Sequence, residues 1–259
     1  VQIRLQGSAE GSKIGYYDSI VFKEVGVAAG WTTADAEPLI PQTALMGMSK
    51  PMVFDGYDDY LKVDSAIGNL GSTASISAWI SRESVTSGAS YLFDARGDGA
   101  GGTGYCTFGG GVATFEGSDG TEYVDGALGD TVPADGKFHH VVLTGATVNI
   151  AEDIRFGARY NNISLFYGVM NEISLWNKTL SLAEVQELFN DGVPLDATTH
   201  SASPSTGTDN LIGYWRNDGA VSWSDISQNS NNGTPAGSPV TLLLPEGTTS
   251  GKDILGFPL

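Results

Sequence analysis

The chain has 259 residues, of which 41% are hydrophobic, and this length fits one large β domain with a smaller additional segment. Glycine is abundant, with 35 residues, whereas charged residues make up only 17%, a composition typical of short strands joined by tight turns. The formal net charge of −17 would repel nucleic acid and anionic membrane surfaces, so we exclude both as partners.

Cysteine and hydropathy exclude further classes. The single cysteine, Cys106, rules out a disulfide within the chain, and only three histidines remain as zinc ligands, which argues against zinc. No apolar run reaches the ~18 residues that a membrane span needs, so membrane insertion is not expected.

Residues 1–49 predict one strand and an irregular connector. Ile20 and Phe22 alternate with Ser19 and Lys23, as in a strand, and residues 26–48 have no regular pattern. We expect this segment to be the end of a preceding β domain or an arm between chains. Because the chain begins with a valine and not a methionine, we also expect it to be the C-terminal part of a longer polypeptide.

Residues 50–194 predict an antiparallel β-sandwich. Short apolar segments alternate with Gly, Asp and Ser, a spacing that favours a sandwich over a parallel sheet. The segments are MVF, YLKV, ASISAWI, SYLFDAR, YCTFGG, VATFE, FHHVVLTG, IRFGARY and GVMNEISLW. In ASISAWI, Ile76, Ala78 and Ile80 should face one side and Trp79 the other, so we expect both faces of this strand to be covered.

One helix is predicted, in LSLAEVQELFNDG. Ser181 and Glu184 form an S-x-x-E capping box, in which each side chain accepts a hydrogen bond from a backbone N–H at the helix start. Leu182, Val185, Leu188 and Phe189 share one face, and Gly192 should end the helix in the left-handed conformation. We expect the helix to cover an edge of the sandwich.

Residues 195–259 form a C-terminal extension. Residues 195–210 are polar and typical of a linker, residues 211–223 regain strand character, residues 225–239 are turn-rich, and residues 240–244 predict a short strand. Two alternatives stay open for this extension: it completes the sandwich, or it pairs with a neighbouring chain.

Four stretches together resemble a known family. FDGYDDYLKV, SISAWI, FHHVVL and GVMNEISLWNKTLSLAEVQELFNDG occur in that order within residues 50–192. They are similar to the concanavalin A-like lectin/glucanase superfamily, and most of all to its laminin-G/pentraxin-like jelly-roll branch. The resemblance implies an all-β fold of two curved antiparallel sheets, here with one short helix.

The flanks resemble other proteins. LIGYWRNDGAVSWSDISQNSNNGT resembles the segment that normally opens a laminin-G-like domain, although here it follows the FDG motif. This order, together with the ending LLLPEGTTSGKDILGFPL, is similar to virion structural proteins of marine bacteriophages.

The acidic stretch after Phe54 suggests either a calcium site or a shaped turn. Asp55 and Gly56 suit a turn, and Asp55, Asp58 and Asp59 could supply oxygen ligands of the kind that Ca²⁺ prefers. The resemblance implies that an Asp of the "D-E-V" motif completes such a site. Asn171 stands there, and it offers an oxygen without charge. We therefore name Asp55, Asp58 and Asn171 as candidate ligands of one structural Ca²⁺.

Catalytic residues are not expected. Glycosidases need two carboxyl groups ~5–10 Å apart, and the glucanase relatives carry them on one strand as E-x-D-x-E. The nearest string here, EGSDGTE, holds Glu116, Asp119 and Glu122 at wider spacing with two glycines and predicts a loop. In FHHVVLTG, either His139 or His140 could serve a ligand, but one buried and one surface histidine is the simpler interpretation. We predict that the chain is not an enzyme.

Sugar-binding relatives use aromatic, Asp and Asn side chains of rim loops. The candidate ligand-binding residues are Tyr57, Asp98, Tyr105, Tyr160, Asn161 and Asn162. For each tyrosine, a place in the core or at a strand edge is the alternative.

The resemblance implies a non-enzymatic virion structural protein, such as a capsid decoration, a fibre or a tail-associated subunit. Its expected partners are other virion proteins, copies of itself and host surface glycans, and its expected location is the virion surface. The alternative is a calcium-dependent carbohydrate-binding module of a secreted bacterial adhesin or polysaccharide-active enzyme. A divergent glucanase is a third hypothesis.

Overall fold

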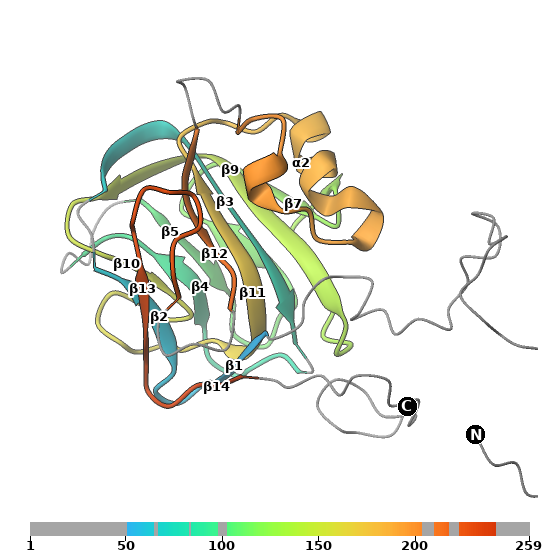
Figure 1. Cartoon of the computed structure of the whole chain (residues 1–259). Coiled ribbons are helices and arrows are strands. Elements are labelled where there is room, and N and C mark those ends of the chain that lie inside the picture. Colours follow the sequence, from blue (N-terminus) through green and yellow to red (C-terminus); the bar gives the residue numbers. More distant parts are fainter. Residues whose placement is uncertain are drawn as a thin grey trace, which may run out of the picture. The chain divides into compact units, whose positions relative to one another are not determined.

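A computed structural model describes residues 51–64, 67–82, 84–97, 103–203, 210–217 and 223–241. In these residues two antiparallel sheets pack face to face as a sandwich with one short α-helix, so the predicted all-β fold class is confirmed (Figure 1). Within the described ranges, no helix is long and apolar enough to span a membrane. The strand and connector predicted in residues 1–49 lie outside the described residues.

Each sheet combines strands from distant parts of the chain. The larger sheet has eight strands: β14 (Val240–Thr241), β1 (Met52–Asp55), β11 (Tyr167–Trp176), β3 (Gly68–Ser81), β9 (Phe138–Ile150), β7 (Thr121–Val124) and β8 (Ala127–Leu128) in order, with β12 (Leu211–Trp215) also paired to β11. The smaller sheet has six: β13 (Gly233–Ala236), β2 (Tyr60–Val63), β10 (Ile154–Phe156), β4 (Ser90–Asp94), β5 (Tyr105–Phe108) and β6 (Phe115–Gly117).

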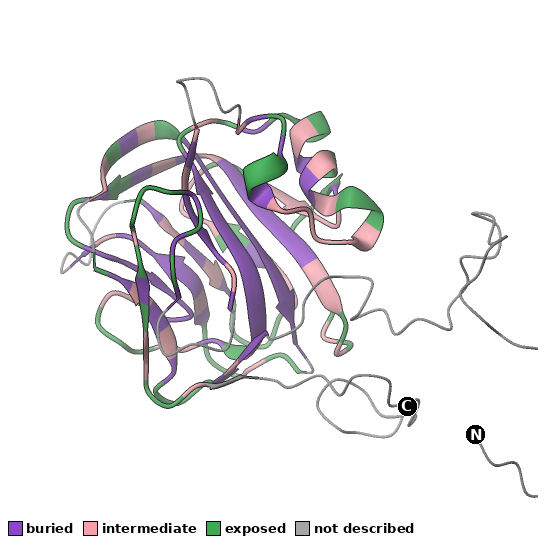
Figure 2. Ribbon diagram, viewed as in Figure 1, coloured by how far each residue is buried: buried purple, intermediate pink, exposed green. Residues whose placement is uncertain are grey.

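The main core lies between the sheets, and the central strands of the larger sheet are covered on both faces. Buried residues run along β3, β9 and β11 (Figure 2). Ile76, Ala78 and Ile80 belong to the main core, while Trp79 on the opposite face stacks on Phe189. The prediction that both faces of this strand are covered is therefore confirmed.

The C-terminal extension adds strands to both sheets. β12 pairs with β11, β13 pairs with β2, and β14 pairs with β1. Trp215 of β12 is fully buried against Phe156, with ring centroids 5.3 Å apart, and its indole N–H donates to the carbonyl oxygen of Asn231 at 2.7 Å. The described residues 211–217 and 223–239 thus supply part of the core, although the domain boundaries drawn from the sequence stay a prediction.

Two loop predictions are wrong in part. Residues 233–236, within the turn-rich stretch, form the edge strand β13. In EGSDGTE, Glu116 lies in β6 and Glu122 in β7, so the chain crosses from the smaller to the larger sheet there. Only residues 118–120 between these strands form the turn, because Gly120, with a φ of 102°, allows the chain to change sheets abruptly.

The predicted helix is α2 (Leu182–Phe189), and its capping box between Ser181 and Glu184 is present. The helix ends earlier than predicted. Asn190 already adopts a left-handed φ of 46°, ahead of Gly192, because asparagine tolerates this conformation better than most residues. Val185 and Leu188 are buried, whereas Leu182 is exposed, so the apolar face is narrower than the sequence predicts.

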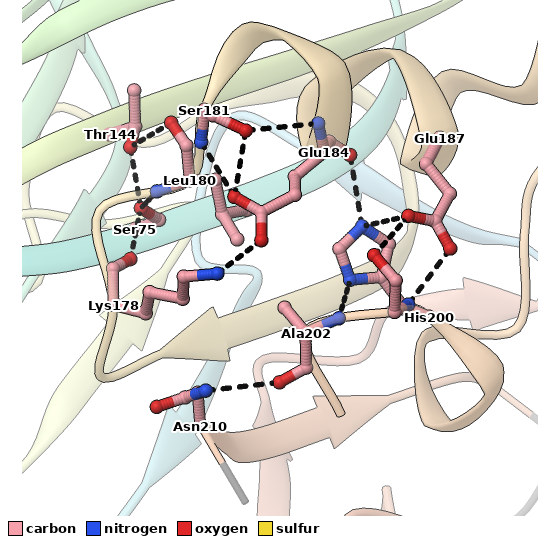
Figure 3. Close-up of polar contacts among 11 residues, drawn as sticks. Ser75, Thr144, Lys178, Leu180, Ser181, Glu184, Glu187, His200, Ala202 and Asn210 are labelled. Atoms are coloured by element: carbon pink, nitrogen blue, oxygen red, sulfur yellow. Dashed lines mark hydrogen bonds and ion pairs between the residues drawn. The ribbon is translucent and has the colours of Figure 1, made fainter. Parts of the chain in front are cut away.

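The helix covers the outer face of the larger sheet and is fixed by polar contacts (Figure 3). The Ser75 hydroxyl donates to the Lys178 carbonyl oxygen at 2.6 Å and accepts from the Leu180 N–H at 3.1 Å. Thr144 on the neighbouring strand donates to the Leu180 carbonyl oxygen at 3.1 Å. These bonds satisfy the buried backbone of the loop that leads into the helix.

His200 ties the following segment to the same helix (Figure 3). Its Nδ1 accepts from the Ala202 N–H at 3.0 Å, so its Nε2 carries the hydrogen that is donated to the Glu184 carbonyl oxygen at 2.9 Å. Because this side chain is buried, both ring nitrogens need the partners that they have.

Trp215 should be essential to the sandwich. We expect Trp215→Ala to lower the free energy of unfolding by about 3–5 kcal/mol, since it leaves a large cavity in the core. Leu128→Ala is the control, and we expect its effect to stay within about 0.5 kcal/mol because this side chain is 73% exposed. Urea unfolding of both variants checks this, and equal effects would contradict the place of β12 in the core.

Stability should fall in acid because of His140. This buried ring packs against Trp79 and Phe189, its Nδ1 has no partner among the described residues, and burial lowers its pKa to about 3. Between the ordinary pKa of about 6.5 and the lowered value, the unfolded chain binds a proton that the folded chain does not. The contribution of His140 to the free energy of unfolding therefore has its full value above about pH 6.5. Below this pH it falls by about 1.4 kcal/mol per pH unit.

The His140→Phe variant isolates this contribution. We expect the stability difference between wild type and this variant to change between pH 7 and pH 4.5, measured by urea unfolding at each pH. His139→Asn is the matched control and should keep the acid-dependent loss. If the His140→Phe variant loses stability in acid as steeply as wild type, the assignment to His140 is wrong.

Candidate functional site

An open groove of about 490 Å³ lies where three loops meet, and we call it the rim groove. The loops follow β1, precede β4 and join β10 to β11. The groove is lined by Asp55, Gly56, Tyr57, Thr86, Gly88, Ala89, Asn162, Ile163, Ser164, Leu165 and Tyr167. Its volume falls within the range of ordinary small-molecule sites.

The turn after β1 forms one wall of the rim groove. One carboxylate oxygen of Asp55 accepts from the N–H of Tyr57 at 2.7 Å and of Asp58 at 3.3 Å, while Gly56 adopts a φ of +75°. Asp59 accepts from the Asp55 N–H at 3.1 Å and from the Ser238 N–H at 2.9 Å. These bonds shape the turn so that Tyr57 projects into solvent, 83% exposed.

Exposed apolar side chains gather at this groove. Besides Tyr57, Ile163 is 48% exposed and Tyr167 is 41% exposed. Ile163 lies between Asn162, with a φ of +59°, and Ser164, with a φ of +54°. Two left-handed residues other than glycine, one on each side of Ile163, cost free energy, and such strain is concentrated at functional loops. The loop thus holds an apolar side chain in water at a conformational cost.

The three acids of the turn lie close together. Asp55, Asp58 and Asp59 each offer a ligand oxygen, and these oxygens lie within 4.8 Å of one another. Burial, together with the charges of Asp55 and Asp58, raises the pKa of Asp59 above its ordinary value. A set of carboxylate oxygens at such spacing fits the ligand preference of Ca²⁺, and a bound cation would relieve their repulsion.

Asn171 is not part of this acidic cluster. Asp55 pairs with Tyr167 at one end of β1 and Met52 pairs with Met170 at the other, so Asn171 lies beyond the far end. Four residues along a strand separate Asn171 from Tyr167, about 13 Å. Its side-chain oxygen accepts from the Asn217 N–H at 3.0 Å. Among the three predicted calcium ligands, the structure brings together Asp55 and Asp58, with Asp59 as the neighbour that was left out.

The other predicted ligand-binding residues fall into two places. Tyr57 and Asn162 line the rim groove. Tyr105 and Tyr160 instead flank the guanidinium of Arg96, which lies 4.1 Å and 5.4 Å from their ring centroids. Asn161 is exposed between Tyr160 and Asn162 in the chain, and Asp98 lies outside the described residues.

The remaining titratable candidates have structural partners. His139 is held between Asp125 at 2.7 Å and Asp135 at 3.1 Å, and its side chain is only 11% exposed, whereas His140 is buried as a core histidine was expected to be. Glu122 accepts from the Gly117 N–H at 3.0 Å, and Asp119 accepts from the Thr147 N–H at 3.0 Å. These contacts fix turns.

The sequence interpretation missed part of the groove. Thr86, Ile163, Ser164 and Tyr167 were not among its candidates, although they line the groove beside Tyr57 and Asn162. For Ile163 a signal existed, because a lone β-branched residue stands within the polar run NNIS. For Tyr167 there was none, because a tyrosine at a strand start is ordinary.

Comparisons with known proteins agree with this fold. Residues 55–151 match the model of the concanavalin A-like lectin/glucanases superfamily. A protein from Bacteroides ovatus ATCC 8483, described as a candidate carbohydrate binding protein, has a similar structure, with a TM-score of 0.52 and 14% identity over 76% of this chain and 60% of that one. The chain thus spans about 60% of the length of that protein.

A second structure is more distant. The native heptameric SAP-like pentraxin from Limulus polyphemus has a TM-score of 0.33 and 11% identity, over 55% of this chain and 82% of its own. No curated protein matches the sequence. The resemblance to the concanavalin A-like lectin/glucanase superfamily is confirmed by the family match over residues 55–151 and by the sandwich itself.

Proposed function

We propose that the sandwich is a non-enzymatic carbohydrate-binding module and that it binds its ligand in the rim groove. The single observation that carries the proposal is the gathering of Tyr57, Ile163 and Tyr167, all exposed, around an open groove. Apolar and aromatic surface left in water beside a few polar groups is characteristic of binding sites.

The chemistry of the groove suits a saccharide. A tyrosine offers an apolar ring face against the C–H face of a sugar and a hydroxyl at its tip. Thr86, Asn162 and Ser164 lie among the lining residues, and their side chains can donate and accept hydrogen bonds with sugar hydroxyls. Gly56 and Gly88 leave the backbone open to close approach by a ligand.

The absence of catalysis is supported by the distribution of acids. Cleavage of a glycosidic bond needs two carboxyl groups on opposite sides of the bond. Among the described residues that line the groove, Asp55 is the one acid, and Asp58 and Asp59 belong to the same turn. No carboxylate of the described lining faces this turn from the opposite wall.

We further propose that Ca²⁺ takes part. Asp55, Asp58 and Asp59 are the residues that would hold it, and the bound ion would supply positive charge next to the groove for sugar hydroxyl oxygens. The turn itself is already shaped by its own hydrogen bonds, so these residues would provide a preformed set of oxygens.

The proposal is supported by the similar fold of the Bacteroides ovatus protein, which is described as a candidate carbohydrate binding protein. The proposed setting is the surface of a phage virion, where host glycans would be the ligands and other virion proteins the partners. A secreted bacterial module is the alternative setting, and the proposed groove would act in the same way in both.

Removal of the Tyr57 ring should abolish most of the binding. On a glycan array, we expect wild type to bind one glycan class, and Tyr57→Ala to bind it at least tenfold more weakly, a loss of about 1.4 kcal/mol. Leu128→Ala removes another strongly exposed side chain, 73% against 83% for Tyr57, away from the groove and should bind normally. EDTA and Asp58→Asn should each weaken binding, and added Ca²⁺ should reverse the effect of EDTA only.

Two results would count against the proposal. If the wild-type chain binds no glycan on the array, or if Tyr57→Ala and Leu128→Ala bind equally well, the groove is not the site. If wild type releases new reducing ends from the bound glycan, the module is an enzyme.

A further inference from the structure

A row of polar side chains crosses the outer face of the smaller sheet. Lys62 pairs with Thr234 on one side and with Arg155 on the other, and Arg155 pairs in turn with Asp94. Asp94 pairs on its other side with Tyr105 of β5. Their strand neighbours, such as Leu61 and Phe156, belong to the core, so the members of the row face outward.

Arg155 lacks the partners that a buried arginine needs. The residue is 8% exposed, and its Nη2 donates to Asp153 at 2.8 Å. Its Nε and Nη1 are buried and have no hydrogen-bond partner in the part of the chain that the structure describes. Arg96, two residues after the end of the neighbouring strand β4, is bound by both carboxylate oxygens of Asp94. Unpaired buried donors are rare in folded proteins, and an ordered water, an ion or a ligand can supply the missing acceptor.

The charges around Arg155 favour an anion. Asp153 uses one carboxylate oxygen for both Arg155 and Lys62, which lies 3.2 Å away. Asp64, 3.4 Å from Lys62, is 76% exposed at its side chain and is screened by water. Asp94 is already matched by Arg96. Two cations thus share one oxygen of a buried carboxylate, whose Oδ1 has no partner among the described residues, in a chain whose net charge is −17.

The same face offers contacts for a sugar ring. Tyr60 lies two residues before Lys62 on β2 and therefore on the same face, where it is half-buried. Tyr105, half-buried at the other end of the row, already lies against the Arg96 guanidinium, so Tyr60 provides the ring for this contact. Lys62, with 32% of its side chain exposed, and the exposed Thr234 leave the row open to solvent beside Arg155.

We propose that this row binds an acidic saccharide, with a carboxylate or sulfate group held between Arg155 and Lys62. Guanidinium groups bind such oxyanions through paired, charge-assisted hydrogen bonds, and a lysine adds a mobile positive charge. The site is separate from the rim groove, and its binding does not depend on the function proposed for the groove.

Calorimetric titration at low ionic strength tests the site with matched probes. The probes are an oligogalacturonate, the same oligosaccharide with its carboxylates reduced to alcohols, a sulfated oligosaccharide, and inorganic sulfate. We expect the two acidic oligosaccharides to bind at least tenfold more tightly than the reduced one and than inorganic sulfate. Added salt should weaken their binding.

Variants locate the binding. Arg155→Gln should weaken it at least tenfold. Thr234→Glu places a carboxylate beside Lys62 without touching a buried group, and should also weaken it several-fold. Thr121→Glu makes the same exposed charge change on the larger sheet and should leave binding unchanged. Thermal unfolding verifies that each variant is folded. If Arg155→Gln does not fold, Thr234→Glu still tests the site.

Four outcomes decide the proposal. Weaker binding in Thr234→Glu together with normal binding in Thr121→Glu supports it. If the acidic and the reduced oligosaccharide bind with equal affinity, the site does not recognise an anion. If inorganic sulfate binds as tightly as the acidic oligosaccharides, the site does not recognise a saccharide. Loss of acidic-saccharide binding in Tyr57→Ala assigns the ligand to the rim groove instead.

Discussion

The structure depends on the burial of β11 from both sides. This strand pairs with β1, β3 and β12, and its residues are buried on both of its faces. Ile173 and Leu175 point into the main core, whereas Trp176 lies under α2 and β12. A strand that is covered on both faces cannot slip by one residue, because a slip would exchange every side chain between two different environments.

The same strand buries the carboxylate of Glu172, and its charge must be compensated. At the irregularity after Asn171, Glu172 adopts a φ of +53° and turns its carboxylate toward β12. There it accepts from Arg216 Nε at 2.7 Å and from the Tyr214 hydroxyl. Burial raises the pKa of Glu172, and Arg216 opposes this shift. Loss of one partner of such a buried pair leaves an uncompensated charge, so the carboxylate ties β12 to the sandwich.

Sequence reasoning succeeded where local chemistry decides the structure and failed where distant contacts decide it. The capping box of Ser181 and the alternation around Trp79 were predictable, because each depends on neighbours in the chain. β13 was not: it contains Pro235, which predicts a turn but is tolerated on an edge strand. Asn171 was chosen by resemblance, and only the strand register shows its distance from Asp55. Likewise, Ile163 is exposed because its neighbours are left-handed, which a residue type alone does not predict.

Two strands of the smaller sheet position both proposed surfaces. The turn with Asp55 and Tyr57 leads into β2, which carries Lys62, and β10, which carries Arg155, leads into the loop with Ile163. The acids therefore gather in the turn before β2, while two cations lie side by side where β2 pairs with β10. On a chain of net charge −17, long-range repulsion disfavours acidic glycans over most of the surface. A local cation with unpaired donors can reverse that preference only at short range, so the geometry of Arg155, and not the overall charge, would set the selectivity for acidic sugars.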